Sequence, residues 1–193
     1  DRPDKNAKKN AKWRKLANDN MDQTQYEEWV GKVFKNVITH LDSKSPYYIW
    51  QGYKQIGATE NILMRLGCEL STIIVWKKPT PTLSYADYNL QCEFCLYGFK
   101  EGEGKHPFYG ENNSSTCWEI KRDSSKDLIH PTQKPLELVL RSIKNSSKRG
   151  DILLEPFLGS GSVLISSEAS GRICYGVEID PWYVDAIVRR YIN

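Results

Sequence analysis

A glycine-rich turn after a short apolar segment is the feature that most constrains the fold of this 193-residue chain. Residues 151–157 are rich in apolar side chains and are followed by Gly159-Ser160-Gly161. This pattern is typical of a buried parallel strand, so we expect Ile152, Leu153 and Leu154 in the core of a sheet. Glycines without Cβ atoms allow positive φ angles and let a ligand approach the backbone.

A second strand that ends in an acidic residue follows this turn. The pattern predicts a helix over residues 163–170 and a strand over residues 173–179, which carries Glu178 to the carboxyl edge of the sheet. Glu155 and Glu178 are separated by close to the roughly 20 residues expected between a glycine turn and a ribose-binding acid. A carboxylate there can accept hydrogen bonds from both ribose hydroxyls, so the pattern favours an adenosine site in a Rossmann-type sheet.

The turn differs from a dinucleotide fingerprint. Such a fingerprint has a third glycine at the start of the helix, where this chain has Val163-Leu164. A pyrophosphate cradle is therefore not favoured, and an adenosine ligand without phosphate fits better. Two alternatives stay open on the glycines alone: a tight turn in an unrelated α/β protein, and a nicotinamide-dependent oxidoreductase.

Local signals predict the other elements. A Thr24-x-x-Glu27 capping box is expected to open a helix that runs to Leu41. Asp180 is expected to be the N-cap of the last helix, with Pro181 at its first position. Strands are expected at 47–50 and 70–76, paired in parallel, with an edge-side strand at 92–99; helices at 59–66 and 136–145; and an irregular insertion at 98–127.

Three segments resemble the end of the DNA amino-methyltransferases, which methylate adenine N6 or cytosine N4 with S-adenosylmethionine. They are HPTQKP (130–135), EPFLGSGS (155–162) and GVEIDPWYVDAIVRRY (176–191). Upstream, YYIW (47–50), IIVWKK (73–78) and EFCLYGFKEG (93–102) extend the likeness over most of the chain. The order is similar to a permuted branch in which the catalytic half comes first, and small phage and prophage members look most alike.

The resemblance implies one methyltransferase domain with a Rossmann-like α/β fold, in which a mostly parallel sheet has helices on both faces. Residues 1–23 would be a basic loop after the catalytic motif, 24–97 the catalytic half, 98–128 a target-recognition insertion and 129–193 the cofactor half. It also implies a cofactor pocket for S-adenosylmethionine, made by His130, Pro131, Thr132, Lys134, Glu155, Phe157, Gly159, Ser160, Gly161, Ser162 and Glu178.

Within that pocket, Thr132 and Lys134 offer a hydroxyl donor and a cation to the methionine carboxylate. Glu155 offers negative charge to the ammonium or sulfonium group, and Glu178 is assigned to the ribose hydroxyls. The family usually has aspartate where this chain has Glu155. Because the glutamate side chain is longer, we expect its contact with the cofactor to differ from that of the usual aspartate.

The family's catalytic tetrapeptide, of the type Asp-Pro-Pro-Tyr, is expected before the helix near Thr24, but the 193 residues contain no Pro-Pro pair. We expect the catalytic residues upstream of Asp1 and the chain to be a fragment; natural degeneration is the alternative. Residues 180–183 (DPWY) and 45–48 (SPYY) are read instead as a helix N-cap and a strand start.

Charge and cysteine content restrict the other function classes. The net charge of +3, from 27 basic and 24 acidic residues, is too small to argue for DNA alone. Five cysteines and no signal peptide indicate reduced thiols in a cytoplasmic protein without a membrane segment, and the lone Cys92-x-x-Cys95 pair predicts no metal site. Candidate phosphate contacts, with a solvated surface as the alternative, are Lys9, Lys12, Arg14, Lys105, Lys121 and Arg122.

The sequence therefore predicts a methyltransferase that acts on N6 of adenine in duplex DNA, with the target base flipped out of the helix. Cytosine N4 is the alternative target. A DNA-binding relative that kept the pocket without activity is the alternative class. A cognate restriction nuclease is a candidate partner.

Overall fold

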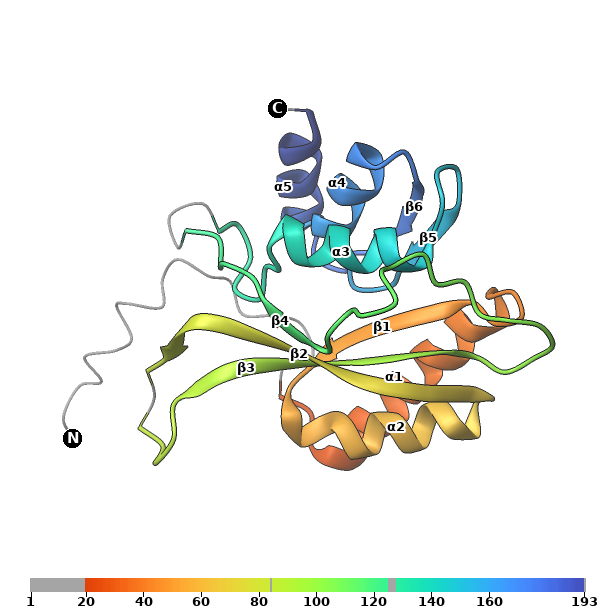
Figure 1. Ribbon diagram of the computed structural model, residues 1–193. Helices are drawn as coiled ribbons and strands as arrows, with labels where there is room; N and C mark the ends of the chain where they lie inside the picture. The colour runs from red at the N-terminus through yellow and green to blue at the C-terminus, as the bar shows by residue number, and fades with distance from the viewer. Residues whose placement is uncertain (1–19, 84, 125–127, 193) are drawn as a thin grey trace.

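The chain forms an α/β fold with a four-stranded sheet and a two-stranded sheet (Figure 1). The computed structural model describes residues 20–83, 85–124 and 128–192. The larger sheet and its helices comprise α1 (Gln23–Thr39), β1 (Pro46–Gln51), the 3₁₀ turn η2 (Tyr53–Gln55), α2 (Ile56–Arg65), β2 (Cys68–Thr82), β3 (Leu90–Lys100) and β4 (Cys117–Glu119). The smaller half comprises α3 (Leu136–Ser146), β5 (Ile152–Glu155), α4 (Ser162–Ala169), β6 (Ile173–Gly176) and α5 (Pro181–Ile192).

The order of the larger sheet is β1-β3-β2-β4, and it corrects two expectations. The predicted edge-side strand at 92–99 is wrong, because β3 lies between β1 and β2 and pairs antiparallel with both. The direct parallel pairing of β1 with β2 is wrong for the same reason. The short connection after β2 allows a hairpin, which places β3 beside β2, whereas parallel neighbours need a longer crossover.

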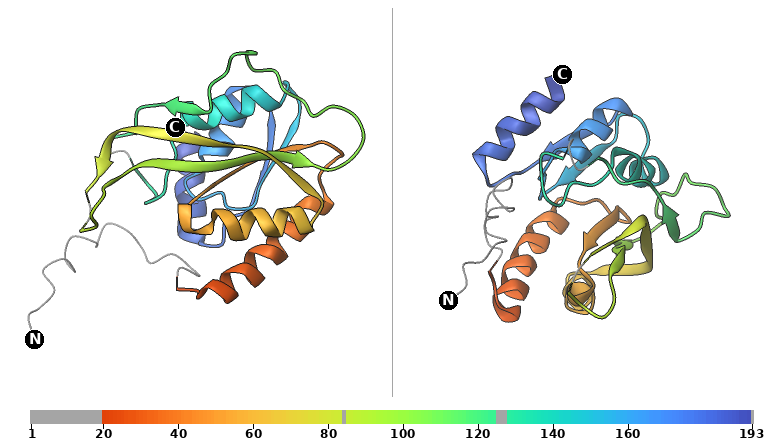
Figure 2. Two further views of the ribbon diagram at one scale, coloured as in Figure 1. Left: turned by 60° about the horizontal axis from the view of Figure 1, so that its bottom comes forward. Right: turned by 90° about the vertical axis from the view of Figure 1, so that its left-hand side faces the viewer.

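Helices cover both faces of the larger sheet, with α1 and α2 on one side and α3 on the other (Figure 1, Figure 2). On one face, Val30, Phe34 and Ile38 of α1 pack with Ile62 and Leu63 of α2 in one hydrophobic cluster that also contains Cys68 and Leu96. On the other face, Leu138 of α3 packs with a cluster that contains Ile74, Trp76, Cys95, Tyr97, Trp118 and Ile120. The alternation of side chains along β3 explains the division, because successive residues point to opposite faces.

The capping box of α1 differs from the expected one. Asp22, not Thr24, is the N-cap: its carboxylate accepts from the backbone N–H of Gln25, and the Gln25 side chain accepts from the backbone N–H of Asp22. Both pairs have the same spacing, so the sequence pattern alone did not separate them. The expected N-cap of α5 is confirmed, since Asp180 accepts from the backbone N–H of Trp182 at 2.9 Å.

The smaller sheet has the predicted parallel pair, with Ile152 opposite Ile173 and Glu155 opposite Gly176. Its expected core is only partly buried: the exposed fraction is 65% for Ile152 and 38% for Leu154. Among the described residues, α4 packs on this sheet and against α3, and side chains on the other face of β5 are left open. Ile152 and Leu154 are exposed, against expectation, because a helix covers only one face of this sheet.

The expected insertion at 98–127 is irregular for most of its described length but returns to the sheet. Gly98 and Phe99 belong to β3, and residues 101–116 contain no helix or strand. The short β4 then pairs in parallel with Val75–Lys77 of β2. Trp118 of β4 is buried, and its indole N–H donates to the carbonyl of Ser115 at 2.9 Å. This tryptophan therefore belongs to the core of the sheet.

Candidate cofactor site

The glycine turn connects the carboxyl end of β5 with the first turn of α4. Gly159 and Gly161 have φ angles of +55° and +75°, which side chains rarely allow. A Cβ atom on Gly161 would lie 2.7 Å from Cγ2 of Ile187 in α5. Only glycine fits both the backbone conformation and this close packing at position 161.

Glu178 lies against the glycine turn, two residues beyond the end of β6. Its Oε2 accepts from the backbone N–H of Gly159 at 2.7 Å, and its Oε1 accepts from the backbone N–H of Asp180 at 3.0 Å. An ionised carboxylate has about four acceptor positions, so each oxygen can accept one further hydrogen bond. Two vicinal hydroxyls are a ligand of that chemistry.

The HPTQKP turn packs on the same glycines. A Cβ atom on Gly159 would lie 3.8 Å from Nε2 of the buried His130 side chain. Nδ1 of His130 accepts from the backbone N–H of Thr132 at 3.2 Å, so Nε2 carries the proton in the neutral ring. Burial lowers the pKa of His130, against the opposing influence of Glu178. The imidazole therefore lies beside the glycine turn as a neutral donor.

Lys134 joins this turn to both halves of the protein. Its carbonyl accepts from Oγ of Ser162 at 2.9 Å, while its Nζ donates to Oε2 of Glu93 at 2.8 Å. Lys78 lies 3.5 Å from the other oxygen of Glu93. Burial opposes ionisation of Glu93, but the two ammonium groups outweigh it and lower the pKa of this carboxyl. To make the expected contact with a methionine carboxylate, Lys134 would have to bind that carboxylate and Glu93 at the same time.

Glu93 is a residue that the sequence reasoning did not identify as part of the site. Its available signal was one acidic residue in the otherwise apolar run of β3, EFCLYGF. A partly buried carboxylate in such a strand generally has a cationic partner, although the sequence does not say which lysine supplies it.

Glu155 is the second acid at the turn. It accepts from the backbone N–H of Phe157 at 2.9 Å, and burial raises the pKa of its carboxyl to about 7. A cationic ligand group beside it would favour the ionised form. The ring of Phe157 lies 5.5 Å from that of Trp29 in α1, which links the turn to the larger half.

The serines of the turn are held within the protein. Oγ of Ser160 and Oγ of Ser162 are 3.1 Å apart, and both side chains are buried. The guanidinium of Arg190 in α5 donates to the carbonyl of Ser160 at 2.9 Å and to Oγ of Ser162 at 3.3 Å. Arg190, which was not predicted, therefore fixes the turn from the side of α5.

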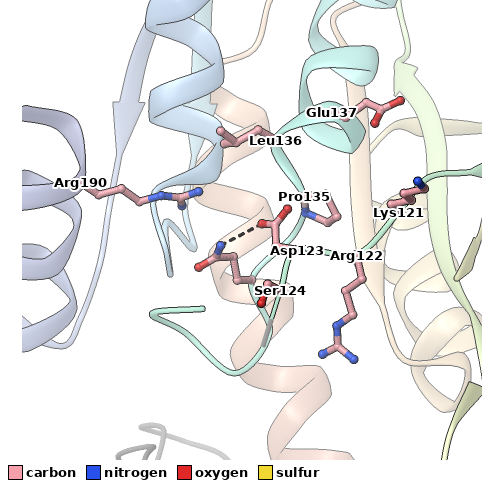
Figure 3. A pocket seen from close by; sticks show the side chains of 9 residues that line it. Lys121, Arg122, Asp123, Ser124, Pro135, Leu136, Glu137 and Arg190 are labelled. Atoms are coloured by element: carbon pink, nitrogen blue, oxygen red, sulfur yellow. Dashed lines mark hydrogen bonds between the residues drawn. The ribbon is translucent and has the colours of Figure 1, made fainter. Parts of the chain in front are cut away.

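A cavity of about 500 Å³ borders the HPTQKP turn (Figure 3). Its basic side chains come from two separate parts of the chain, the segment after β4 and the last turn of α5. Asp123 accepts from the side chain of Gln133 at 3.0 Å, which ties the segment after β4 to the turn. The lining consists of Lys121, Arg122, Asp123, Ser124, Gln133, Pro135, Leu136, Glu137 and Arg190.

The predicted phosphate contacts do not form one group. Lys121 and Arg122 line this cavity and are exposed. Lys105 lies in the segment that follows the carboxyl end of β3 and does not line this cavity. Lys9, Lys12 and Arg14 lie outside the described residues. Pro131 and Thr132, at the tip of the turn, are half-buried and exposed respectively.

Two further properties concern the described residues only. Residues 20–83, 85–124 and 128–192 contain no group of three or more His, Cys, Asp or Glu side chains that could hold a metal ion. In the same ranges, no helix has the length and apolar character needed to cross a membrane.

Several methyltransferases are similar to this chain. The Type II methyltransferase M2.MboI of Moraxella bovis is 24% identical over 93% of this chain and 69% of its own length. M.HinfI of Haemophilus influenzae is also 24% identical, over 88% of this chain, but the match spans about half, 52%, of that enzyme.

The fold of this chain is also similar to solved structures of methyltransferases. The complex of M1.HpyAVI with S-adenosylmethionine superposes with a TM-score of 0.72 at 25% identity, over 84% of this chain and 80% of that one. The cytosine-N4-specific PvuII DNA methyltransferase gives 0.74 at 18% identity, over 95% and 76%. The predicted Rossmann-like α/β fold is confirmed by this likeness. Residues 4–189 match the DNA methylase family N6_N4_Mtase, and the chain therefore belongs to that family.

Proposed function

We propose that this chain binds S-adenosylmethionine and acts in the transfer of its methyl group to N6 of adenine in duplex DNA. The observation that carries the proposal is the position of Glu178, which holds the glycine turn through the Gly159 N–H and keeps acceptor capacity for a ribose. The likeness to M1.HpyAVI, solved with S-adenosylmethionine, supports the same cofactor.

The residues around the turn fit the parts of this cofactor. Glu178 would accept from the ribose hydroxyls, as a carboxylate at the end of the second strand does in related folds. Glu155, with a pKa of about 7, would become ionised beside the ammonium or sulfonium group. Thr132 lies exposed at the tip of its turn with its hydroxyl 3.0 Å from Nδ1 of His130, and it would offer that hydroxyl to the methionine end of the cofactor.

The reaction needs positioning more than covalent chemistry. The lone pair of an exocyclic amine is delocalised into its ring, so the amine must be held in line with the sulfonium methyl. The methyl group passes from sulfur to nitrogen, and the nitrogen loses one proton, which leaves S-adenosylhomocysteine. The target base has to leave the helix to reach the site. This chain would orient the methyl donor for that attack.

Cytosine N4 is the second candidate target. The fold match with a cytosine-N4-specific enzyme is the observation in its favour, and at 18% identity it concerns the fold alone. A binding protein without activity is the remaining alternative. A restriction nuclease would be the natural partner, since the relatives are Type II methyltransferases.

The test is a transfer assay with labelled S-adenosylmethionine, mixed-sequence duplex DNA and the product of the complete gene. Digestion to nucleosides then separates N6-methyladenine from N4-methylcytosine. We expect N6-methyladenine, strongly reduced by Glu178→Ala and unchanged by Glu168→Ala, an exposed acid on α4. Labelled cytosine would move the proposal to the second target, and cofactor binding without transfer would contradict the activity.

A further inference from the structure

The β2–β3 hairpin extends beyond the sheet to which it belongs (Figure 1). Pairing between the two strands continues from Cys68↔Lys100 to Thr82↔Leu90. The neighbouring strands cover much less: β1 pairs with residues 94–99 of β3, and β4 pairs only with residues 75–77 of β2. The outer part of the hairpin therefore has no strand beside it among the described residues.

Large apolar side chains gather at the tip of this hairpin. Leu83, Tyr85 and Tyr88 are almost wholly exposed, and about half of Leu90 is exposed. Polar or small residues are the usual choice at an exposed turn, and a group of exposed apolar residues generally marks an interaction site. Leu83, Tyr85 and Tyr88 therefore have almost no packing partner among the described residues.

The hairpin leaves the sheet on the side of the HPTQKP turn. At its base, Glu93 of β3 holds both Lys78 of β2 and Lys134 of the HPTQKP turn. In Figure 1 the tip and the segment that leads into α3 lie on the same side of the molecule. A duplex that delivers a base to this turn would therefore meet the hairpin.

Charge along the hairpin separates two kinds of contact. Residues 79–91 contain no lysine or arginine and one acid, Asp87, so the tip itself has no cation for a phosphate. Lys121 and Arg122 are exposed in the segment after β4, and β4 pairs with β2 near the base of the hairpin. Cations thus lie at the base and aromatic rings at the tip, which matches phosphates on the outside of a duplex and apolar base faces inside it.

We propose that the tip of the β2–β3 hairpin is a wedge that packs Tyr85 and Tyr88 against the base stack of duplex DNA, while Lys121 and Arg122 contact phosphates. The inference rests on the proposed function, because it assumes that DNA approaches the candidate cofactor site at the HPTQKP turn. Extrusion of a base leaves a gap in the stack, and an aromatic side chain is suited to fill it.

The test measures binding of a labelled mixed-sequence duplex to the 193-residue chain by fluorescence anisotropy, with S-adenosylhomocysteine present. The double variant Tyr85→Ala/Tyr88→Ala is expected to bind at least about fivefold more weakly, the low end of what one lost aromatic–base stack costs. Tyr85→Phe/Tyr88→Phe is expected to retain affinity. Tyr53→Ala, which removes a half-exposed tyrosine of η2, is the matched control.

Salt dependence separates the wedge from the phosphate contacts. The slope of log affinity against log salt should stay unchanged in the double tyrosine variant, because no cation is lost. Lys121→Ala and Arg122→Ala should each make it shallower by about one unit or less. A tyrosine variant that changes the slope but not the affinity at low salt would contradict the wedge.

Other outcomes separate this inference from the proposed function. Calorimetric binding of S-adenosylmethionine by the wild type tests the cofactor site without DNA. If the cofactor binds but the duplex does not, or if the tyrosine variants bind duplex like the wild type, the wedge is wrong and the cofactor site stands. Sedimentation that shows a dimer lost in the tyrosine variants would assign the tip to self-association and overturn the proposal.

Discussion

The two halves of this protein are stabilised in different ways. Trp76, Cys95 and Leu96 of the larger sheet are at most 1% exposed, and helices cover both faces of that sheet. In the smaller half, Ile152 and Ile173 are at least half exposed. The larger half thus has a well-buried hydrophobic core, whereas the smaller half, which contains the glycine turn, buries little apolar surface.

In the smaller half, side-chain hydrogen bonds supplement the limited apolar burial. The buried Ser167 in α4 donates to the carbonyl of Val163 at 2.7 Å, and the buried Ser170 at the C-cap of α4 donates to that of Ser166 at 2.6 Å. Arg172, just before β6, donates to the carbonyl of Ser147 at 2.6 Å. The serine bonds lie within α4 and its C-cap, whereas the Arg172 bond joins the segment before β6 to the end of α3 and so ties two parts of the smaller half together.

The largest expected contrast between the halves concerns apolar burial. Leu96→Ala should lower the free energy of unfolding by about 2–5 kcal/mol, because it removes a fully buried side chain and leaves a cavity. Ile152→Ala, on the open face of β5, should lower it by less than about 1 kcal/mol. Urea denaturation of both variants measures the difference. Equal losses would mean that the open face of β5 is covered in solution.

A second contrast concerns glycines. Gly161→Ala should lower the free energy of unfolding by roughly 1–3 kcal/mol, since alanine is strained at φ +75° and its Cβ meets Ile187. Gly57→Ala, in α2, has open space around the new Cβ and should stabilise by about 0.4–1 kcal/mol. Thermal denaturation followed by circular dichroism checks both signs. Destabilisation by Gly57→Ala would contradict the account of α2.

The pH dependence of cofactor binding should report Glu155. Its pKa is raised from 4.5 to about 7, so the folded chain holds an extra proton between these values, and folding stability falls as pH rises through that window. A cationic ligand favours the ionised form. Affinity for S-adenosylmethionine should therefore rise by about tenfold from pH 6 to pH 8. Glu155→Gln should abolish most of this rise in calorimetric titrations; a rise of the same size in the variant would assign it to another group.

The smallest expected effect concerns the ion pair between the halves. Glu93→Gln leaves Lys78 and Lys134 without a carboxylate and should weaken cofactor binding by about 1 kcal/mol through the HPTQKP turn. Because the pKa of Glu93 is lowered, its stabilisation is present above the unfolded value of 4.5 and is lost as pH falls through the lower folded value. Glu119→Gln breaks the exposed pair with Lys77 and is the control. Equal effects in the two variants would contradict a role of Glu93 in positioning the turn.

The sequence predicts the parts of this molecule that local chemistry determines. The glycine turn, the helix after it and the N-cap at Asp180 were all predictable, because each depends on residues that are close together in the chain. The central place of β3 was not, since strand order depends on pairing partners far apart in sequence. The Glu93–Lys134 pair was missed for the same reason: its two residues belong to different halves.

The open face of β5 shows a further limit. Ile152 and Leu154 are as apolar as core residues, so the sequence pattern predicts a buried strand, but both side chains are exposed. Their exposure depends on which elements cover the strand, and apolar periodicity contains no information about that. The resemblance supplied the candidate site residues, but not the hydrogen bonds of Arg190 to the glycine turn and of Lys134 to Glu93.

Calorimetric titration of the chain with S-adenosylmethionine, in wild-type and Glu178→Ala forms, tests the central claim most directly. The account predicts binding by the wild type and a loss of roughly 1–3 kcal/mol in the variant, because charge-assisted hydrogen bonds to the ribose are removed. Glu168→Ala should bind like the wild type. Unchanged affinity in a folded Glu178→Ala variant, or binding of NADH in place of S-adenosylmethionine, would contradict the assignment of the glycine turn and Glu178 as the cofactor site.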